Sequence, residues 1–125
     1  MQRPRTSMDL FDTTQLGLER ALSGAARRQS AIAANLANVN TPGYRRQDVD
    51  FHSELQRAFA AGRDAVEAVE PSMQVDPAAP MRADGNSVDV DTEAAAQAKN
   101  GLEYEALSAV LKARSDILQT AMGVK

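Results

Sequence analysis

The chain has 125 residues, enough for one domain with a core of modest size. It contains no cysteine, which excludes a disulfide framework, a cysteine-ligated zinc site and a cysteine nucleophile. Tryptophan is also absent, and only two Tyr and three Phe accompany many alanines. Such small side chains suit helices that pack closely along narrow stripes, and they do not suit a thick globular interior.

The net charge of −3 conceals two parts of opposite sign. Residues 1–46 carry seven basic and three acidic side chains, a balance of +4, whereas residues 47–125 carry seven basic and fourteen acidic ones, a balance of −7. This division favours ion pairs between the two parts, either within one chain or between neighbouring copies. Two solvated faces that never meet are the alternative, and the sequence fits both.

Residues 13–40 are predicted to form a long helix after a flexible segment over residues 1–12. Asp12, Thr13 and Thr14 are suitable caps for its first turn, because their side-chain oxygens accept unpaired amide protons. Residues then recur in steps of four and three, the spacing of a coiled-coil seam. This seam consists of Leu18, Leu22, Ala25, Gln29, Ile32, Leu36 and Val39. Its polar member, Gln29, either pins the register of a partner helix or lies at the edge of the contact.

A turn followed by a short helix is predicted over residues 41–62. The sequence Thr-Pro-Gly-Tyr at 41–44 places Pro-Gly at the two central positions, which is typical of a type II turn with a positive φ at the glycine. Proline also excludes helical geometry at the residue before it. The short helix is expected to begin at a cap, either Asp50 or Ser53, and to end at Gly62.

Residues 63–91 are predicted to form an irregular linker, because prolines interrupt a stretch with little periodicity. A turn is expected at its Asp-Gly-Asn sequence, at 84–86. The second long helix is predicted over residues 92–123. Asp89 or Asp91 caps its start, and Gly123 ends it.

The expected fold is therefore all-α. Two long terminal helices pair as an antiparallel-type coiled-coil hairpin, with a short helix and an irregular loop between them. The residues predicted to pack the helices together are Leu18, Leu22, Ile32, Leu36, Val39, Leu102, Tyr104, Leu107, Leu111 and Leu118. These apolar side chains are too few to offset the ordering of two long helices comfortably, so packing is predicted to be completed in an assembly.

The sequence contains no group of residues with the spacing of a catalytic, cofactor or metal site. His52 is the single histidine, and no serine, thiol or second histidine stands at a motif spacing from it, so it is interpreted as a surface residue. The acidic run from Asp84 lacks the glycine and the final glutamate of a calcium loop. We therefore expect no enzyme activity, no cofactor and no small-molecule substrate.

Nucleic acid and membrane are also unexpected partners. The arginine pairs at 27–28 and 45–46 have Tyr44 as their one nearby aromatic residue, the chain is acidic overall, and no recognised nucleic-acid-binding motif appears. No stretch approaches the roughly 20 apolar residues of a membrane span. The amino terminus also lacks the apolar run and small-residue cleavage site of a secretory signal peptide.

The residues at 35–45, Asn-Leu-Ala-Asn-Val-Asn-Thr-Pro-Gly-Tyr-Arg, closely resemble the amino-terminal signature of bacterial flagellar rod and hook proteins. Their continuation at 46–51 and the Gly-Asn-Ser-Val-Asp sequence at 85–89 are similar to the proximal-rod type of that family. The carboxy-terminal half follows the same pattern at Glu93, Asn100, Leu102, Tyr104, Leu107, Leu111 and Leu118. Two separated motifs in the right order make the resemblance specific.

The resemblance implies a structural subunit of the basal-body proximal rod, which transmits torque and forms part of a hollow export shaft. It implies a periplasmic location, reached through the flagellar type III export apparatus without cleavage of a signal. The implied partners are copies of this chain, other rod proteins, the export apparatus and the basal-body adaptor protein. A soluble helical adaptor or secretion chaperone is the alternative.

The resemblance assigns eight signature residues to the turn and to subunit contact. They are Asn35, Asn38, Asn40, Thr41, Pro42, Gly43, Tyr44 and Arg45. Physical chemistry alone leaves two roles open for Asn35 and Asn38, which are spaced three residues apart. They either form hydrogen bonds at the end of their own helix or contact a neighbouring subunit.

Overall fold

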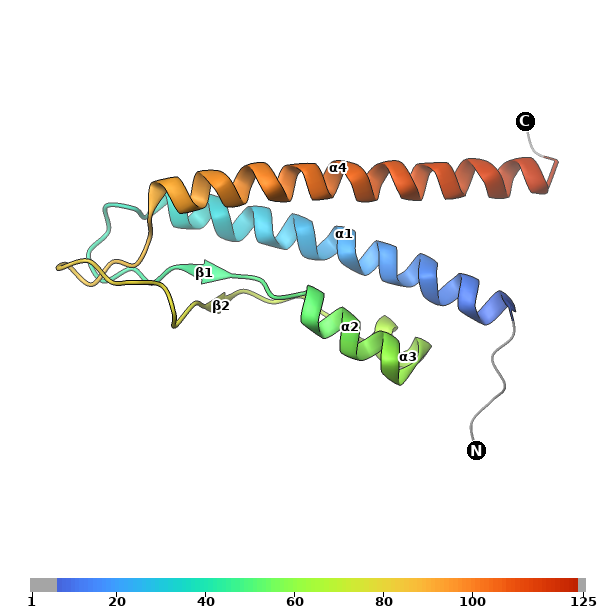
Figure 1. Cartoon of the computed structure of the whole chain (residues 1–125), viewed down its shortest axis with the longest axis horizontal. Coiled ribbons are helices and arrows are strands. Elements are labelled where there is room, and N and C mark those ends of the chain that lie inside the picture. The colour runs from blue at the N-terminus through green and yellow to red at the C-terminus, as the bar shows by residue number, and fades with distance from the viewer. Residues whose placement is uncertain (1–6, 124–125) are drawn as a thin grey trace.

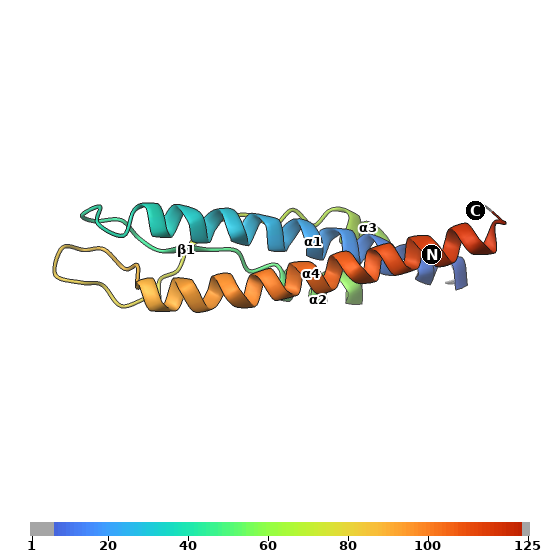
Figure 2. The same ribbon diagram turned by 90° about the horizontal axis from the view of Figure 1, so that it is seen from above.

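The computed structural model describes residues 7–123, which form an elongated molecule of three layers (Figure 1). The elements in chain order are α1 (Ser7–Ala37), β1 (Gln47–Asp48), α2 (His52–Ala61), α3 (Arg63–Glu67), β2 (Gln74–Val75) and α4 (Val90–Ala121). Helix α1 is the middle layer, with α4 along one side and the short helices and strands on the other. The long helices run antiparallel and lie side by side in both views (Figures 1 and 2). The predicted all-α hairpin is therefore confirmed.

Helix α1 begins earlier than the sequence pattern predicted. It starts at Ser7, six residues before the expected start, so that Asp12, Thr13 and Thr14 lie inside the helix and do not cap it. No proline or glycine stands between residues 7 and 13 to interrupt the helix. The flexible segment predicted over residues 1–12 is thus wrong from Ser7 onward, and its first six residues lie outside the described part.

The largest apolar cluster lies between α1 and the layer of short elements. Its members are Ala25, Ala31, Val49, Phe51, Leu55, Ala58, Val66 and Val69. The Phe51 ring is fully buried, and it lies so close to α1 that a β carbon on Gly24 would stand 2.3 Å from its Cγ atom. The glycine therefore lets the ring approach the helix backbone. The sequence pattern pointed instead to the contact between the two long helices as the main core.

The linker predicted over residues 63–91 is not irregular throughout. It contains α3 and β2, and β2 pairs antiparallel with β1 so that Gln47 faces Val75 and Asp48 faces Gln74. The guanidinium of Arg20 on α1 also donates a hydrogen bond to the Glu67 carbonyl at 2.8 Å. The residues that order this segment, in β1 and α1, lie far from it in the sequence. Local periodicity therefore could not predict its structure.

Helix α4 begins at the predicted cap, because the Asp89 carboxylate accepts a hydrogen bond from the Asp91 amide at 2.9 Å. It ends at Ala121, shortly before Gly123 with its φ of 74°. Gly62 likewise ends α2. At the start of α2, in contrast, the residue in the cap position is Phe51, which forms no side-chain cap bond, although the Asp50 carboxylate accepts a 3.4 Å bond from the Ser53 amide.

The residues predicted to pack the long helices fall into three groups in the single chain. Ile32 is buried, whereas Leu18, Leu22, Leu36, Val39, Leu107 and Leu111 are half-buried. Tyr104, Leu118 and above all Leu102, which is 69% exposed, lie largely open to solvent. In the single chain Leu102 faces away from α1 for a physical reason, so its role in helix packing stays a prediction about an assembly. Asn100 occupies the inward face of α4, and two further residues turn the helix by about 200°.

Candidate functional site

The signature turn at residues 41–44 has the geometry that its Pro-Gly pair predicts. Gly43 has a φ of 78°, and the Tyr44 amide donates to the Thr41 carbonyl at 3.2 Å. Thr41, Pro42 and Gly43 are exposed, and residues 38–40 connect the turn to the end of α1 at Ala37. This end of the molecule is where the loops gather, opposite the start of α1 and the end of α4 (Figure 1).

Asn86 holds the end of α1 from the second half of the chain. Its fully buried side-chain amide donates to the carbonyls of Asn38 at 2.9 Å, Val39 at 3.2 Å and Thr41 at 2.8 Å. The amide oxygen in turn accepts from the Val88 amide at 2.7 Å. These three residues follow Ala37, the last residue of α1. Asn86 therefore holds the chain that leaves α1 from 45 or more positions away in the sequence.

Backbone groups continue the contact between the two turns. The Gly43 amide donates to the Asp84 carbonyl at 2.9 Å, and the Ser87 amide donates to the Tyr44 carbonyl at 3.0 Å. Gly85 has a φ of 83°, and a β carbon there would lie 3.4 Å from the Gly43 Cα atom. The two glycine turns thus lie against each other closely. We call this contact between residues 38–46 and 82–88 the interlock.

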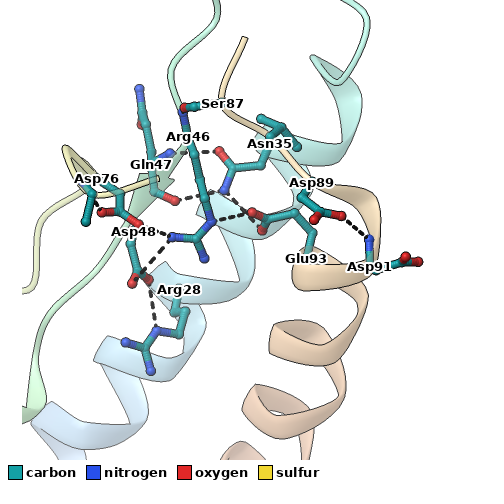
Figure 3. A network of polar contacts seen from close by, with 12 residues as sticks. Arg28, Asn35, Arg46, Gln47, Asp48, Asp76, Ser87, Asp89, Asp91 and Glu93 are labelled. Atoms are coloured by element: carbon teal, nitrogen blue, oxygen red, sulfur yellow. Dashed lines mark hydrogen bonds and ion pairs between the residues drawn. The ribbon is translucent and has the colours of Figure 1, made fainter. Parts of the chain in front are cut away.

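A buried ion pair connects the interlock to α4 (Figure 3). Arg46 Nε lies 2.5 Å from Oε1 of Glu93, whose side chain is fully buried in the first turns of α4. The same guanidinium lies 3.0 Å from the Asp76 carboxylate and 3.8 Å from that of Asp48, to which Arg28 also binds at 3.2 Å. The basic part of the chain therefore pairs with the acidic part within one molecule, as one of the two readings of the charge division predicted.

The carboxylates around Arg46 favour the charged form of its guanidinium. Burial by itself would lower the pKa of Arg46, but the hydrogen bond and charge of Glu93, with the charges of Asp48 and Asp76, outweigh burial and raise that pKa above its ordinary value. A buried ion pair stabilises a fold only when its remaining oxygen atoms and N–H groups also form hydrogen bonds. The second oxygen of Glu93 accepts a 3.2 Å hydrogen bond from the Asn35 amide.

Asn35 is the centre at which three elements meet (Figure 3). It is fully buried on α1, and its amide nitrogen donates to the Gln47 carbonyl at 2.8 Å. Its amide oxygen accepts from the Gln47 amide at 3.0 Å and from the Tyr44 hydroxyl at 3.4 Å. Asn35 therefore joins α1, β1 and α4 within the chain.

Asn38 also bonds within its own chain. Its amide donates to the Ala34 carbonyl at 2.8 Å, and its oxygen accepts from the Thr41 hydroxyl at 3.1 Å. The other signature residues are placed differently. Asn40, Thr41, Pro42 and Gly43 form an exposed tip, whereas Arg45 is half-buried. The exposed tip is the part of the signature that remains accessible to another molecule.

Two further polar residues that the sequence analysis singled out, His52 and Gln29, lie outside the interlock. His52 is exposed, its Nε2 lies 2.5 Å from a Glu103 oxygen, and its ring stacks on Phe51 with the centroids 4.2 Å apart. Gln29 lies at the contact of the two long helices, where its oxygen accepts a 3.3 Å hydrogen bond from Asn100. Within residues 12–123, no cluster of three or more histidines and carboxylates could hold a metal ion.

Sequence reasoning missed the structural role of Arg46, Glu93, Asn86 and Gly24. Glu93 entered the sequence analysis only through the family resemblance, although it is the most deeply buried acid in this network. A local signal existed for Asn86, because an Asp-Gly-Asn turn places a polar side chain beside a tight bend. No local signal existed for Gly24, whose function depends on a ring 27 residues further along the chain.

This arrangement defines a helical structural protein. The buried side chains of Glu93, Arg46, Asn35 and Asn86 form hydrogen bonds within the chain, and their effect is to fix the angle between an exposed turn and two long helices. Nothing in the part from Ser7 to residue 123 has both the length and the hydropathy that a helix needs to cross a membrane.

Comparison with known proteins identifies the family. Residues 18–45 match the family model described as flagella basal body rod protein. The flagellar basal body rod protein FlgB of Escherichia coli (strain K12) is 35% identical over 135 aligned positions, which cover 90% of this chain and 98% of that protein. The FlgB protein of Salmonella typhimurium (strain LT2) is 32% identical, with coverages of 90% and 97%. That of Cereibacter sphaeroides (strain ATCC 17029) is 34% identical, with coverages of 86% and 93%. The chain belongs to the FlgB family of flagellar basal body rod proteins.

Proposed function

We propose that this chain is a structural subunit of the proximal rod of the flagellar basal body, where it transmits torque as part of a hollow shaft. The observation that carries this proposal is the interlock, which joins the exposed signature turn rigidly to the paired helices. A shaft must resist twisting, and closely packed side chains have little room to move. The angle at which the turn leaves α1 would therefore determine how one subunit meets the next.

In this proposal the partners are copies of the chain, other rod proteins and the basal-body adaptor protein. The flagellar type III export apparatus carries the chain to the periplasm, and no signal peptide is cleaved. No catalytic step is involved, because the buried carboxylate of Glu93 and the half-buried carboxylate of Asp48 are engaged by arginines. The exposed tip of the signature turn contacts the neighbouring subunit.

Two substitutions at Gly43 test the role of the turn. A β carbon at this position meets no atom within 4 Å, so a new side chain changes the backbone preference without a clash. Valine is strained at a φ of 78°, at a cost of roughly 1–2 kcal/mol or more, whereas asparagine adopts this conformation more readily. Gly43→Val should impair swimming and rod assembly with export intact, and Gly43→Asn should be much milder.

The readouts are swimming in soft agar, the exported fraction, and recovery of the chain with purified basal bodies. Normal rods and swimming in Gly43→Val would contradict the role of the turn. A wild-type chain that stays in the cytoplasm as a defined dimer and is missing from basal bodies would overturn the rod assignment. That result would instead support a soluble helical adaptor or secretion chaperone.

A further inference from the structure

The contact between the two long helices contains an asparagine that is followed directly by glycine. Asn100 and Gly101 form the one such pair in the sequence, because the other asparagines precede Leu, Val, Thr or Ser. An Asn-Gly pair is chemically reactive, since the unhindered backbone nitrogen of the glycine can attack the side-chain amide carbon of the asparagine. A larger second residue shields that nitrogen. The sequence thus places its most reactive amide within the helix contact.

The folded chain holds Asn100 in a geometry that blocks this reaction. The Asn100 side chain is 2% exposed, and its amide nitrogen donates to the Ala25 carbonyl at 2.8 Å and to Gln29 at 3.3 Å. Asn100 and Gly101 also lie inside α4, where helical geometry directs each backbone N–H to the carbonyl four residues earlier. The Gly101 nitrogen is therefore held away from the Asn100 side chain, and the attack requires that α4 unwinds.

Packing does not require a glycine at position 101. A β carbon there would meet no atom within 4 Å, and the residue lies within α4 without a positive φ. Glycine in the interior of a helix is less favourable than alanine. Gly101 can therefore be replaced by alanine without disturbing the fold, and the β carbon of the alanine would shield the attacking nitrogen.

We propose that Asn100 is a self-modification site that is closed in the folded chain and opens when α1 and α4 separate. In the open state the Gly101 nitrogen attacks Cγ of Asn100. A new C–N bond forms, the bond from Cγ to the side-chain nitrogen breaks, and ammonia leaves with the proton of the Gly101 amide. Water then opens the resulting five-membered succinimide at one of its two carbonyl carbons and gives aspartate or isoaspartate. Neither step involves oxidation or reduction.

Both products oppose the return of the helix contact. The Asn100 oxygen is buried and accepts no hydrogen bond from the described residues, and the amide nitrogen lies against the Ala25 carbonyl oxygen. An aspartate would place a charge in this buried position, facing a carbonyl oxygen instead of a donor. Isoaspartate adds a methylene group to the backbone and interrupts the hydrogen bonds of α4. A chain that stays unfolded before it assembles therefore loses, with time, its ability to form the hairpin.

Incubation of the wild-type chain and Gly101→Ala in folded and unfolded states tests the site. Each protein is kept at mildly alkaline pH with or without guanidinium chloride, digested, and analysed by peptide mass spectrometry. The peptide that contains Asn100 should gain the mass that replaces NH by O in the unfolded wild type. The gain should be several-fold slower in the folded wild type and in unfolded Gly101→Ala. Asn40, which threonine follows, is the internal control and should remain unchanged.

Equal rates of mass gain in folded and unfolded wild type would overturn the closed state. Equal rates in unfolded wild type and unfolded Gly101→Ala would overturn the role of the glycine. Isomerisation at Asp84 and Gly85, which are also adjacent, does not interfere with this readout, because an Asp-Gly pair isomerises without a change of mass.

Refolding measures the consequence of the modification. After removal of the denaturant, the incubated wild type should lose helical circular dichroism signal in proportion to its modified fraction, whereas Gly101→Ala should recover its signal. Asn100→Asp, which reproduces one product, should lower the urea midpoint of unfolding by about 1 M or more, whereas Asn40→Asp at an exposed position should lower it little. Full recovery of the modified wild type, or wild-type stability of Asn100→Asp, would overturn the proposed effect on the hairpin.

Discussion

Replacement of Gly24 by alanine is the sharpest test of how α1 packs against the rest of the chain. A β carbon at Gly24 would lie 2.3 Å from Cγ of Phe51 and 2.6 and 2.7 Å from the two Cδ atoms. An ordinary contact between carbon atoms is about 3.5–4.0 Å, so the ring or the helix would have to shift by roughly 1 Å. The ring has little freedom to do so, because it is fully buried, stacks on His52 and lies 5.3 Å from the Arg28 guanidinium.

The expected loss of stability combines two opposing effects. Overpacking of a core typically costs about 1–3 kcal/mol, whereas alanine in place of glycine within a helix contributes about 1 kcal/mol of stability. A clash at 2.3 Å falls at the upper end of the overpacking range, so we expect a net destabilisation of about 2 kcal/mol for Gly24→Ala. For a protein of this size, that loss lowers the urea midpoint of unfolding by roughly 1 M. Far-UV circular dichroism during urea titration measures it.

Gly17→Ala is the matched control on the same helix. Its β carbon would lie 2.0 Å from Cζ of Phe59, which is the far end of a side chain that is 39% exposed and can turn away. This variant should therefore be as stable as the wild type or slightly more stable. Phe51→Leu combined with Gly24→Ala should recover part of the loss by removing the ring. Equal stability of Gly17→Ala and Gly24→Ala would refute the reasoning.

Two further predictions concern the interlock and its ion pair. Asn86→Asp replaces the buried amide that faces three backbone carbonyls just after α1 by a carboxylate, so it should cost about 3 kcal/mol or more, whereas the same change at exposed Asn40 should cost little. Urea unfolding compares the two variants. Arg46→Lys keeps the charge but loses the planar fork that binds Glu93 and Asp76 together, and a drop of about 2–3 kcal/mol is expected. Because the pKa of Arg46 is raised on folding, its stabilising contribution is fully present below its unfolded pKa and is lost only as strongly alkaline pH passes the folded pKa. The difference in melting temperature between wild type and Arg46→Lys should therefore be constant across the neutral range, and a difference that disappears there would contradict the assigned role.

The two long helices and the turn between them were predictable because their signals are local. A seam such as Ile32 with Leu36 repeats within one or two turns of helix, and Pro42-Gly43 restricts its own backbone directly. Asp89 and Gly123 mark the bounds of α4 by the same kind of local chemistry. These features depend on neighbours within about four residues.

The interlock and the buried pair were not predictable from pattern alone. Asn86 and Asn38 are 48 positions apart, and Arg46 and Glu93 are 47 apart, so each residue looks like an ordinary surface polar group within its own segment. The same reason explains the error over residues 63–91, where β2 is ordered by β1 and α3 by α1. Prolines correctly excluded long helices there, but they carry no information about distant partners.

The long separation of the interlocked groups also has a kinetic consequence. A polypeptide that emerges amino terminus first from a ribosome or a narrow passage exposes the end of α1 well before Asn86 and Glu93 become accessible. Until then Asn35 lacks Glu93, 58 positions downstream, and the carbonyls just after α1 lack Asn86, 45 to 48 positions downstream. The amino-terminal part therefore cannot complete its folding until the last third of the chain is also available.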